Sequence, residues 1–240
     1  MDELEWDEFA QEYYLNQLES RTTIVRDVID YLKNKKILPT SQIVDVAGGA
    51  GRYLPMAEEA YSYRLIDFST EMLKFAEEEA GKLRLKNVQV KKLSFAEFLK
   101  SKERYALIFT AANPALDNTQ KLEQMLKKMN EACVVVGVVS SKDDLFLPLE
   151  KRLGIYEEDH TASPDLMDQF EKYLRQSNHS YQTKEFTYII KEEITRALME
   201  DYYKEYKGEQ RFIDFVDQYF LQDETIISTT YWIYRLLLIQ

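Results

Sequence analysis

Residues 43–51 have the sequence Ile-Val-Asp-Val-Ala-Gly-Gly-Ala-Gly, a β-branched run followed by a run of small residues. The first part predicts a buried strand, and the second predicts a turn with so little side-chain bulk that a ligand can approach the backbone. Residues 52–60 indicate a helix, in which Pro55 is acceptable because it lies near the first turn. The N–H groups at such a helix start can face a bound polar group.

The spacing of the small residues narrows the choice of ligand. A dinucleotide fingerprint G-x-G-x-x-G starting at Gly49 would need glycine at Leu54, and no phosphate loop ending in G-K-[ST] occurs in the sequence. Both phosphate-binding interpretations are therefore weak. What remains is Asp45 at the end of the predicted strand, followed at every second position by a small residue: Ala47, Gly49 and Gly51.

A second acidic residue, Asp67, stands at the end of the next predicted strand. It lies in the sequence Tyr-Arg-Leu-Ile-Asp-Phe-Ser-Thr-Glu-Met-Leu of residues 63–73. A carboxylate at this place in an α/β sheet can accept both hydroxyls of a ribose. Taken alone, Asp67 has an alternative interpretation as a solvated loop acid that caps the next helix.

The two motifs together resemble those of the class I S-adenosylmethionine (SAM) dependent methyltransferases, D/E-x-G-x-G-x-G followed by G-x-D-x-S-x-x-M-L. Ala47 stands in place of the first glycine of the first motif, and Leu65 stands where glycine is common in the second. The pair of motifs is much more specific than either alone. The residues that match the second motif are Asp67, Ser69, Met72 and Leu73.

The resemblance implies SAM as the cofactor and gives each part of it a place. The glycine loop would lie beneath the methionine part, Asp67 would hold the ribose, and residues 68, 94 and 95 would border the adenine. Ser94 stands where the family usually has an aspartate. The predicted cofactor-binding residues are Asp45, Ala47, Gly48, Gly49, Gly51, Asp67, Phe68, Met72, Ser94, Phe95, Ala111 and Tyr13.

Residues 4–35 predict two helices with a break near Ser20. The first resembles the W/Y-x-x-F/Y-A-x-x-Y opening of many small-molecule methyltransferases, in which this segment folds over the cofactor. The alternative is that its aromatic residues form the apolar face of a helix packed on the sheet. The residues concerned are Trp6, Phe9, Ala10, Tyr13 and Tyr14.

Alternating strands and helices predict an α/β fold with a parallel doubly wound sheet. Further strands are expected at 87–93, 105–112 and 132–139, with helices at 71–82 and 118–131. Residues 226–239 resemble the antiparallel last strand of the Rossmann-like, seven-stranded methyltransferase sheet. The core would then be residues 1–141 and 226–240. Residues 142–225 would form a mostly helical cap or lid outside the sheet, with helices at 165–176, 192–206 and 210–222 and a strand at 186–190.

Composition limits the partners and the location. A net charge of −11 and a pI near 4.9 oppose sequence-independent binding to nucleic acid or to an anionic membrane. We therefore expect a small-molecule acceptor, no nucleic acid and no membrane. The acidic amino terminus is unlike a signal peptide, which indicates a cytoplasmic protein. Cys133, in an apolar run, is expected to be a small buried hydrophobe, and no metal-binding spacing of histidines occurs, so no metal is expected.

The sequence leaves the catalytic residue open. His160 follows three acidic residues and is either a general base or a surface histidine. Asn113-Pro114 resembles half of the N-P-P-Y/F motif of nucleic-acid amino methyltransferases, an interpretation that the acidic charge opposes. A different hypothesis is a catalytically weakened SAM-binding or interaction protein, because three positions depart from the family pattern: Ala47, Ser94 and Ala106. The methyl group of Ala47 would be tolerated if its φ is negative.

Overall fold

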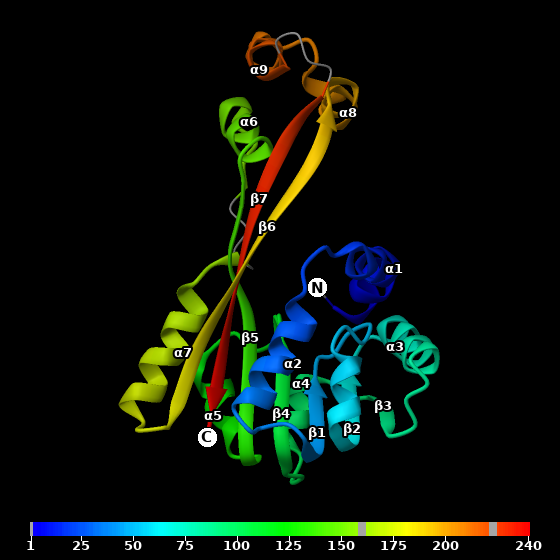
Figure 1. The fold of residues 1–240 in the computed structure, drawn as a ribbon, viewed down its shortest axis with the longest axis vertical. Helices are drawn as coiled ribbons and strands as arrows, with labels where there is room; N and C mark the ends of the chain where they lie inside the picture. Colours follow the sequence, from blue (N-terminus) through cyan, green and yellow to red (C-terminus); the bar gives the residue numbers. More distant parts are fainter. Residues whose placement is uncertain (1, 158–161, 221–224) are drawn as a thin grey trace. The chain divides into compact units, whose positions relative to one another are not determined.

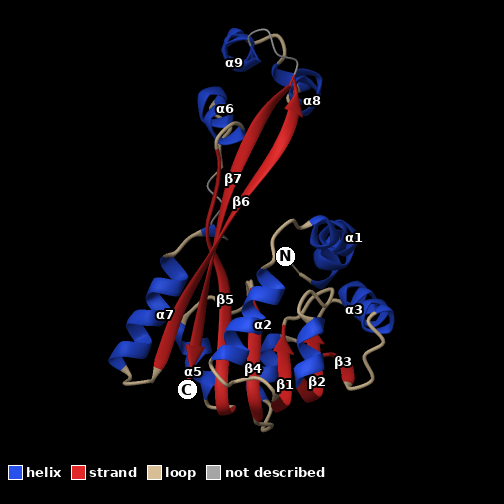
Figure 2. Cartoon of the chain, in the orientation of Figure 1, coloured by secondary structure: helices blue, strands red, loops and turns tan. Residues whose placement is uncertain are grey.

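The computed structural model describes residues 2–157, 162–220 and 225–240. Within these ranges, seven strands form one sheet in the order β3-β2-β1-β4-β5-β7-β6 (Figures 1 and 2). The pairs β1–β2, β1–β4, β2–β3 and β4–β5 are parallel. The predicted Rossmann-like methyltransferase sheet is confirmed. The strands are β1 (Thr40–Val46), β2 (Ala60–Asp67), β3 (Val88–Lys92), β4 (Tyr105–Ala111), β5 (Met129–Asp143), β6 (Tyr181–Thr195) and β7 (Thr225–Ile239).

Helices connect most of the strands, and the predicted break between the first two helices falls at residues 20–23. The α-helices are α1 (Glu3–Glu19), α2 (Ile24–Asn34), α3 (Thr70–Lys82), α4 (Phe95–Lys100), α5 (Thr119–Leu126), α6 (Phe146–Leu153), α7 (Asp165–Gln176), α8 (Arg196–Tyr202) and α9 (Gln210–Phe220). The 3₁₀ helices include η1 (Leu54–Glu59) and η3 (Lys204–Tyr206). None of the helices in the described ranges is both long enough and apolar enough to cross a membrane.

The prediction of a helix at residues 52–60 has to be corrected, because the chain forms a shorter 3₁₀ helix there. The chain there forms two successive four-residue turns, in which Gly51 N–H donates to the Gly48 carbonyl and Leu54 N–H donates to the Gly51 carbonyl, and then the 3₁₀ helix η1. The turns extend to Leu54 and β2 already begins at Ala60, so too few residues remain between them for a longer α-helix. The α-helix start expected after the glycine loop, with N–H groups facing a bound polar group, is therefore absent between β1 and β2.

The prediction that all of residues 142–225 lies outside the sheet is wrong for residues 181–195, which form β6 at the edge of the sheet. Strand β7 runs opposite to β6 (Figure 1), since the N–H of Gln240 donates to the carbonyl of Ser180. Arg235 of β7 pairs with Glu185 of β6 at 2.9 Å and with Glu171 of α7 at 3.2 Å. This partly buried guanidinium joins the two strands to α7.

The chain divides into two compact units. Unit 1 comprises Met1–Gly137, Pro164–Phe186 and Arg235–Gln240, and unit 2 comprises Val138–Ser163 and Thr187–Tyr234. In unit 1, β4 and the part of β5 up to Gly137 carry continuous apolar runs, and helix α1 lies beside α3 (Figure 1). Cys133 is fully buried in β5, as predicted, and burial raises the pKa of its thiol. Unit 1 holds every residue predicted to bind the cofactor.

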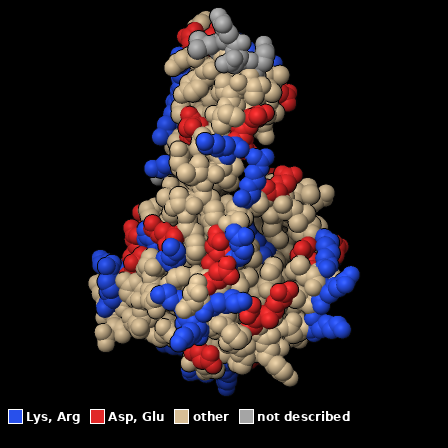
Figure 3. All heavy atoms as spheres, in the orientation of Figure 1, with Lys and Arg blue, Asp and Glu red and all other residues tan. Residues whose placement is uncertain are grey.

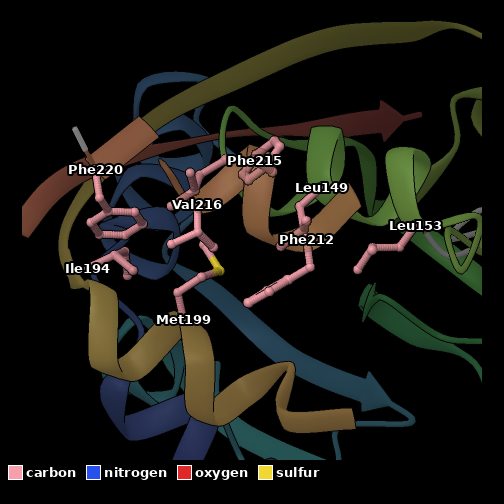
Figure 4. Packing of buried hydrophobic residues seen from close by; sticks show 9 residues of the cluster. Leu149, Leu153, Ile194, Met199, Phe212, Phe215, Val216 and Phe220 are labelled. Carbon is pink, nitrogen blue, oxygen red and sulfur yellow. The ribbon is translucent and has the colours of Figure 1, made fainter. Parts of the chain in front are cut away.

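Unit 2 has an apolar core of its own. Side chains from α6, α8 and α9 converge there (Figure 4), and helices α6 and α9 pack together. Burial of several aromatic and aliphatic side chains in one cluster stabilises a unit of this size. The core residues are Leu145, Leu149, Leu153, Ile194, Met199, Phe212, Phe215, Val216 and Phe220. The assignment of residues 142–225 as a substrate-binding cap stays a prediction.

Candidate cofactor site

The glycine loop lies at the carboxyl end of β1, between β1 and η1. In the strand order, β2 lies on one side of β1 and β4 on the other, so the direction of winding reverses between β1 and β4. Ligands of open α/β sheets bind in the crevice at such a switch point, outside the carboxyl ends of the strands. The loops after β1, β2 and β4 are therefore the candidates for ligand contact.

Asp67 at the end of β2 is tied to the glycine loop. Its Oδ2 accepts a hydrogen bond from the Gly49 N–H at 2.9 Å, and its Oδ1 accepts one from the Ser69 N–H at 2.9 Å. Burial raises the pKa of the carboxyl, and these backbone donors oppose that shift. Each carboxylate oxygen still has a lone pair available, so Asp67 can also accept the hydroxyls of a ribose.

The glycines of the loop differ in the space around them. A Cβ on Gly48 would lie 2.6 Å from Leu65 Cγ, and one on Gly51 would lie 2.4 Å from Leu54 Cδ1, so both positions are closed by packing. A Cβ on Gly49 would meet only the Tyr13 ring, at 3.6 Å. The loop is thus closely packed against other side chains at Gly48 and Gly51, whereas Gly49 has space beside it.

Ala47 does not have the negative φ that would make its methyl group harmless. Its φ is 56°, in the left-handed region that favours glycine. Ala112, directly after β4, has a φ of 47°. Both strained residues follow neighbouring parallel strands at the switch point, and backbone strain of this kind persists where the surrounding structure holds it.

Tyr63 is a residue of the site that the sequence analysis missed. Its hydroxyl donates a 2.7 Å hydrogen bond to Oδ2 of Asp45, and both side chains are buried. Burial raises the pKa of Asp45 to about 7, although the bond from Tyr63 opposes the shift. The Thr110 hydroxyl donates to the Val46 carbonyl at 2.8 Å and fixes β4 against the start of the loop. The sequence of β2, which also contains Tyr61, Ser62 and Arg64, does not single out Tyr63.

Helix α1 packs on the glycine loop. Ala10 and Tyr14 form a buried cluster with Ala50 and Met72, and Trp6, Tyr13 and Phe75 pack against it. The predicted site residues Tyr13 and Met72 are therefore brought to the loop, and Phe68 follows Asp67 directly. Asp7 accepts hydrogen bonds from the Ser69 hydroxyl at 2.6 Å and the Glu71 N–H at 3.1 Å. Asp7, which no motif indicated, joins α1 to the first turn of α3.

The predicted site residues Ser94 and Phe95 follow the end of β3, and Ala111 is at the end of β4. Ser94 caps α4, since its hydroxyl accepts from the Glu97 N–H at 3.3 Å and donates to the Glu97 carboxylate at 2.7 Å. Phe95 is buried and stacks on Phe98. Ala111, the last residue of β4, pairs with Val136 of β5. Ser94 thus uses its hydroxyl within its own capping box.

Asn113 lies just after the strained Ala112. Its Oδ1 accepts a hydrogen bond from the Ala115 N–H at 3.0 Å, while its buried Nδ2 has no partner in the described part of the chain. His160, the candidate base, lies outside the described residues. No group of three His, Cys, Asp or Glu residues suited to a metal ion is found in the ranges that the structure covers.

Comparison with known proteins shows which family the chain belongs to. The family model described as "Methyltransferase domain" matches residues 37–198, which is more than half of the chain. The chain therefore belongs to the methyltransferase-domain family, as its two motifs predicted, and is a SAM-dependent methyltransferase. A search of curated proteins found no match.

Solved structures with low sequence identity share the fold. Magnesium protoporphyrin IX methyltransferase from Synechocystis PCC 6803, with bound S-adenosylhomocysteine (SAH), is 11% identical and has a TM-score of 0.57 over 100% of each chain. Precorrin-6y C5,15-methyltransferase from Geobacter metallireducens is 10% identical, with a TM-score of 0.54 over 92% of this chain and 91% of that one. A DhpI–SAM–HEP complex is 16% identical, with a TM-score of 0.53 over 75% and 89%.

Proposed function

We propose that this enzyme transfers the methyl group of SAM to a small-molecule acceptor. The observation that carries the proposal is the link between Asp67 and Gly49, which places a buried carboxylate beside the open part of the glycine loop. SAM supplies an already activated methyl group. The protein then has to hold donor and acceptor in line and exclude water, without a nucleophile or a metal of its own.

Within this proposal the site residues have distinct roles. The loop of residues 47–51 supports the methionine part, Asp67 accepts the ribose hydroxyls, and Phe68 borders the adenine. Tyr13, which lies against the open side of Gly49, helps to exclude water. Residues 142–225 contribute to acceptor binding, and loosening them should impair acceptor binding more than SAM binding.

A small acceptor is favoured over a nucleic acid by charge. Lys and Arg side chains are interspersed with Asp and Glu on the face shown in Figure 3, and the chain carries a net charge of −11. Phosphate backbones need clustered positive charge. The names of two structurally similar enzymes, which refer to a magnesium protoporphyrin and to a precorrin, support a small acceptor. Salt-sensitive retention on RNA or heparin would count against it. The cytoplasmic location stays a prediction from the sequence.

A second candidate function is a catalytically weakened SAM-binding protein. The observation that favours it is the left-handed φ of Ala47, at the position where the family has glycine. The link between Asp67 and Gly49 is intact, so we expect binding to persist. Turnover in a screen of small acceptors with radiolabelled SAM would favour the enzyme, whereas SAH binding without turnover of any acceptor would favour this second candidate.

Calorimetric titration with SAM and SAH tests the cofactor site. Binding should raise the melting temperature by mass action. Asp67→Ala should weaken SAH binding roughly a hundredfold, because two hydrogen bonds to a charged group are lost. Asp67→Asn keeps one acceptor oxygen and should be affected less. The matched control is Asp117→Ala, an exposed acid in the loop after β4 that pairs with Lys121. A wild-type protein unaffected by millimolar SAH would remove the assignment.

A further inference from the structure

Three aromatic rings of helix α1 form a triangle. The ring centroids of Trp6 and Phe9 are 6.0 Å apart, those of Trp6 and Tyr13 are 6.3 Å apart, and those of Phe9 and Tyr13 are 6.1 Å apart. All three pairs meet edge to face, and all three side chains remain partly exposed. We call these three residues the aromatic triangle.

The aromatic triangle lies beside the glycine loop. Trp6 and Tyr13 pack against the cluster that contains Ala50 of the loop, and Tyr13 Cε1 lies 3.6 Å from the position of a Cβ on Gly49. Gly49 is the loop residue that packing leaves open. A molecule that reaches the cofactor's reactive end above this loop therefore meets partly exposed aromatic rings.

The same helix is strongly acidic. Residues 2–19 contain seven Asp and Glu residues and neither Lys nor Arg. Helical spacing puts Glu5 and Glu12 one turn to either side of Phe9. Asp7 and Asp67 add two carboxylates on the side that faces α3, and they lie close together because both accept hydrogen bonds from Ser69. Lys92 pairs with Glu3 in the first turn of α1.

The aromatic triangle is held in place before any ligand arrives. Asp7 bonds to the start of α3, and the hydroxyl of Tyr14 donates to Glu79 at 2.8 Å. Tyr14 also stacks on Phe75, with ring centroids 4.6 Å apart. Rings on an anchored helix lose little conformational freedom on binding, so the surface is preorganised.

We propose that the aromatic triangle binds a cationic alkylammonium group of the methyl acceptor. Aromatic faces attract such cations, and the surrounding carboxylates add long-range attraction and exclude anions. The inference rests on the proposed function for its place beside the cofactor, and it narrows the acceptor to small molecules that carry an amine. The rings recognise this group, while in-line placement over the loop determines which atom receives the methyl group.

Choline and 3,3-dimethyl-1-butanol are suitable probes because they share a shape and differ in charge. Trp6 reports their binding by fluorescence in a Trp232→Phe variant, since the chain has two tryptophans. The titrations are done with SAH bound, which fills the cofactor site without a sulfonium charge. We expect choline to bind at least tenfold more tightly than the neutral probe, and butyrate to bind more weakly still.

Single substitutions assign the effect to the rings. Phe9→Leu and Tyr13→Leu should each weaken choline binding about fivefold to thirtyfold and leave the binding of the neutral probe nearly unchanged. The matched control is Leu15→Ala, which changes an exposed apolar side chain of the same helix outside the aromatic triangle. Melting temperatures identify any variant that fails to fold.

The outcomes separate this inference from the proposed function. Equal binding of choline and the neutral probe, or no choline binding to a protein that binds SAH, overturns the inference and leaves the cofactor site standing. If Phe9→Leu weakens the binding of SAM much more than the binding of SAH, and choline does not bind, the rings contact the sulfonium of SAM and the inference is overturned. Choline binding by a protein that does not bind SAH supports the cation site and overturns the proposed function.

Discussion

The hydroxyl of Tyr63 donates a 2.7 Å hydrogen bond to Oδ2 of Asp45 inside the sheet, just before the glycine loop. Asp45 is 1% exposed and Tyr63 is fully buried. Burial disfavours the charged carboxylate and raises the pKa of Asp45 to about 7 in the folded protein, compared with 3.8 for the ordinary group. Between about pH 4 and pH 7 the folded state thus holds a proton that the unfolded chain has already released.

Stability should therefore fall as the pH rises from about 4 to about 7. Below the unfolded pKa both states are protonated, and above the folded pKa both are charged, so the loss of stability levels off just above pH 7. A difference of three pKa units corresponds to about 4 kcal/mol. Asp45→Asn should flatten the pH dependence of the free energy of unfolding in this window, measured by urea titration. Tyr63→Phe, which removes the donor to the charged form, should cost more stability at pH 8 than at pH 5.

Ala47→Gly should stabilise the fold. A left-handed conformation costs a non-glycine residue about 1–2 kcal/mol, and the greater freedom of glycine in the unfolded chain returns part of that, so we expect a net gain of about 0.5–1 kcal/mol. Ala50→Gly is the control, because Ala50 is in the same loop but is buried and does not have a positive φ. It should lose about 1 kcal/mol. A destabilised Ala47→Gly variant would show that the loop is not strained.

The same substitution addresses the cofactor. If the methyl group of Ala47 crowds or misplaces the loop, Ala47→Gly should also bind SAH more tightly, as measured by calorimetry. An improvement in stability without any change in affinity would confine the strain to the fold. In that case Ala47 would give no support to the view that the protein is a weakened methyltransferase.

Gly49→Ala and Gly51→Ala should separate binding from folding. A Cβ on Gly51 would overlap Leu54 at 2.4 Å and the φ there is 84°, so this variant should be destabilised by more than about 2 kcal/mol. A Cβ on Gly49 has room, and its φ of 53° should cost only about 1 kcal/mol. Gly49→Ala should still fold, as seen by melting, yet lose SAH binding because the methyl group occupies the cofactor's side of the loop. Unchanged SAH affinity in Gly49→Ala would place the ligand elsewhere.

Much of the sheet could be predicted because β1, β4 and β5 contain continuous β-branched or apolar runs, while β3 shows alternation. Such runs determine a buried parallel strand locally. The type of helix after the glycine loop could not be predicted, since Pro55 and good helix formers are compatible with either an α-helix or the observed 3₁₀ helix. The early start of β2 determines which of the two forms. For β6, alternation is clear only at residues 186–190, whereas pairing with β7 extends the strand to Tyr181–Thr195.

The site residues could likewise be predicted only where local sequence determines their position. Asp67 could be placed from its motif, because the chain fixes the order of strand, acid and helix cap. Tyr63 and Asp7 could not, since each acts on a residue far along the chain: Tyr63 on Asp45, and Asp7 on Ser69. The positive φ of Ala47 was also hidden, because a sequence shows which residues tolerate a conformation and not which conformation the fold imposes.

Asp7 offers a test of how helix α1 is held over the cofactor loop. Its Oδ1 accepts from the Ser69 hydroxyl at 2.6 Å and from the Glu71 N–H at 3.1 Å, at the positive end of α3. Asp7→Ala removes these bonds next to Asp67, so α1 should detach more often and SAH should dissociate about tenfold faster in stopped-flow measurements.

Asp7→Asn separates the bonds from the charge. Its amide oxygen can still accept from Ser69 and Glu71, while the negative charge that raises the pKa of Asp67 is gone. We therefore expect Asp7→Asn to release SAH at the wild-type rate or more slowly. The control is Glu8→Ala, on the exposed side of the same helix. If Asp7→Ala and Asp7→Asn released SAH equally fast, charge rather than attachment of the helix would govern cofactor release.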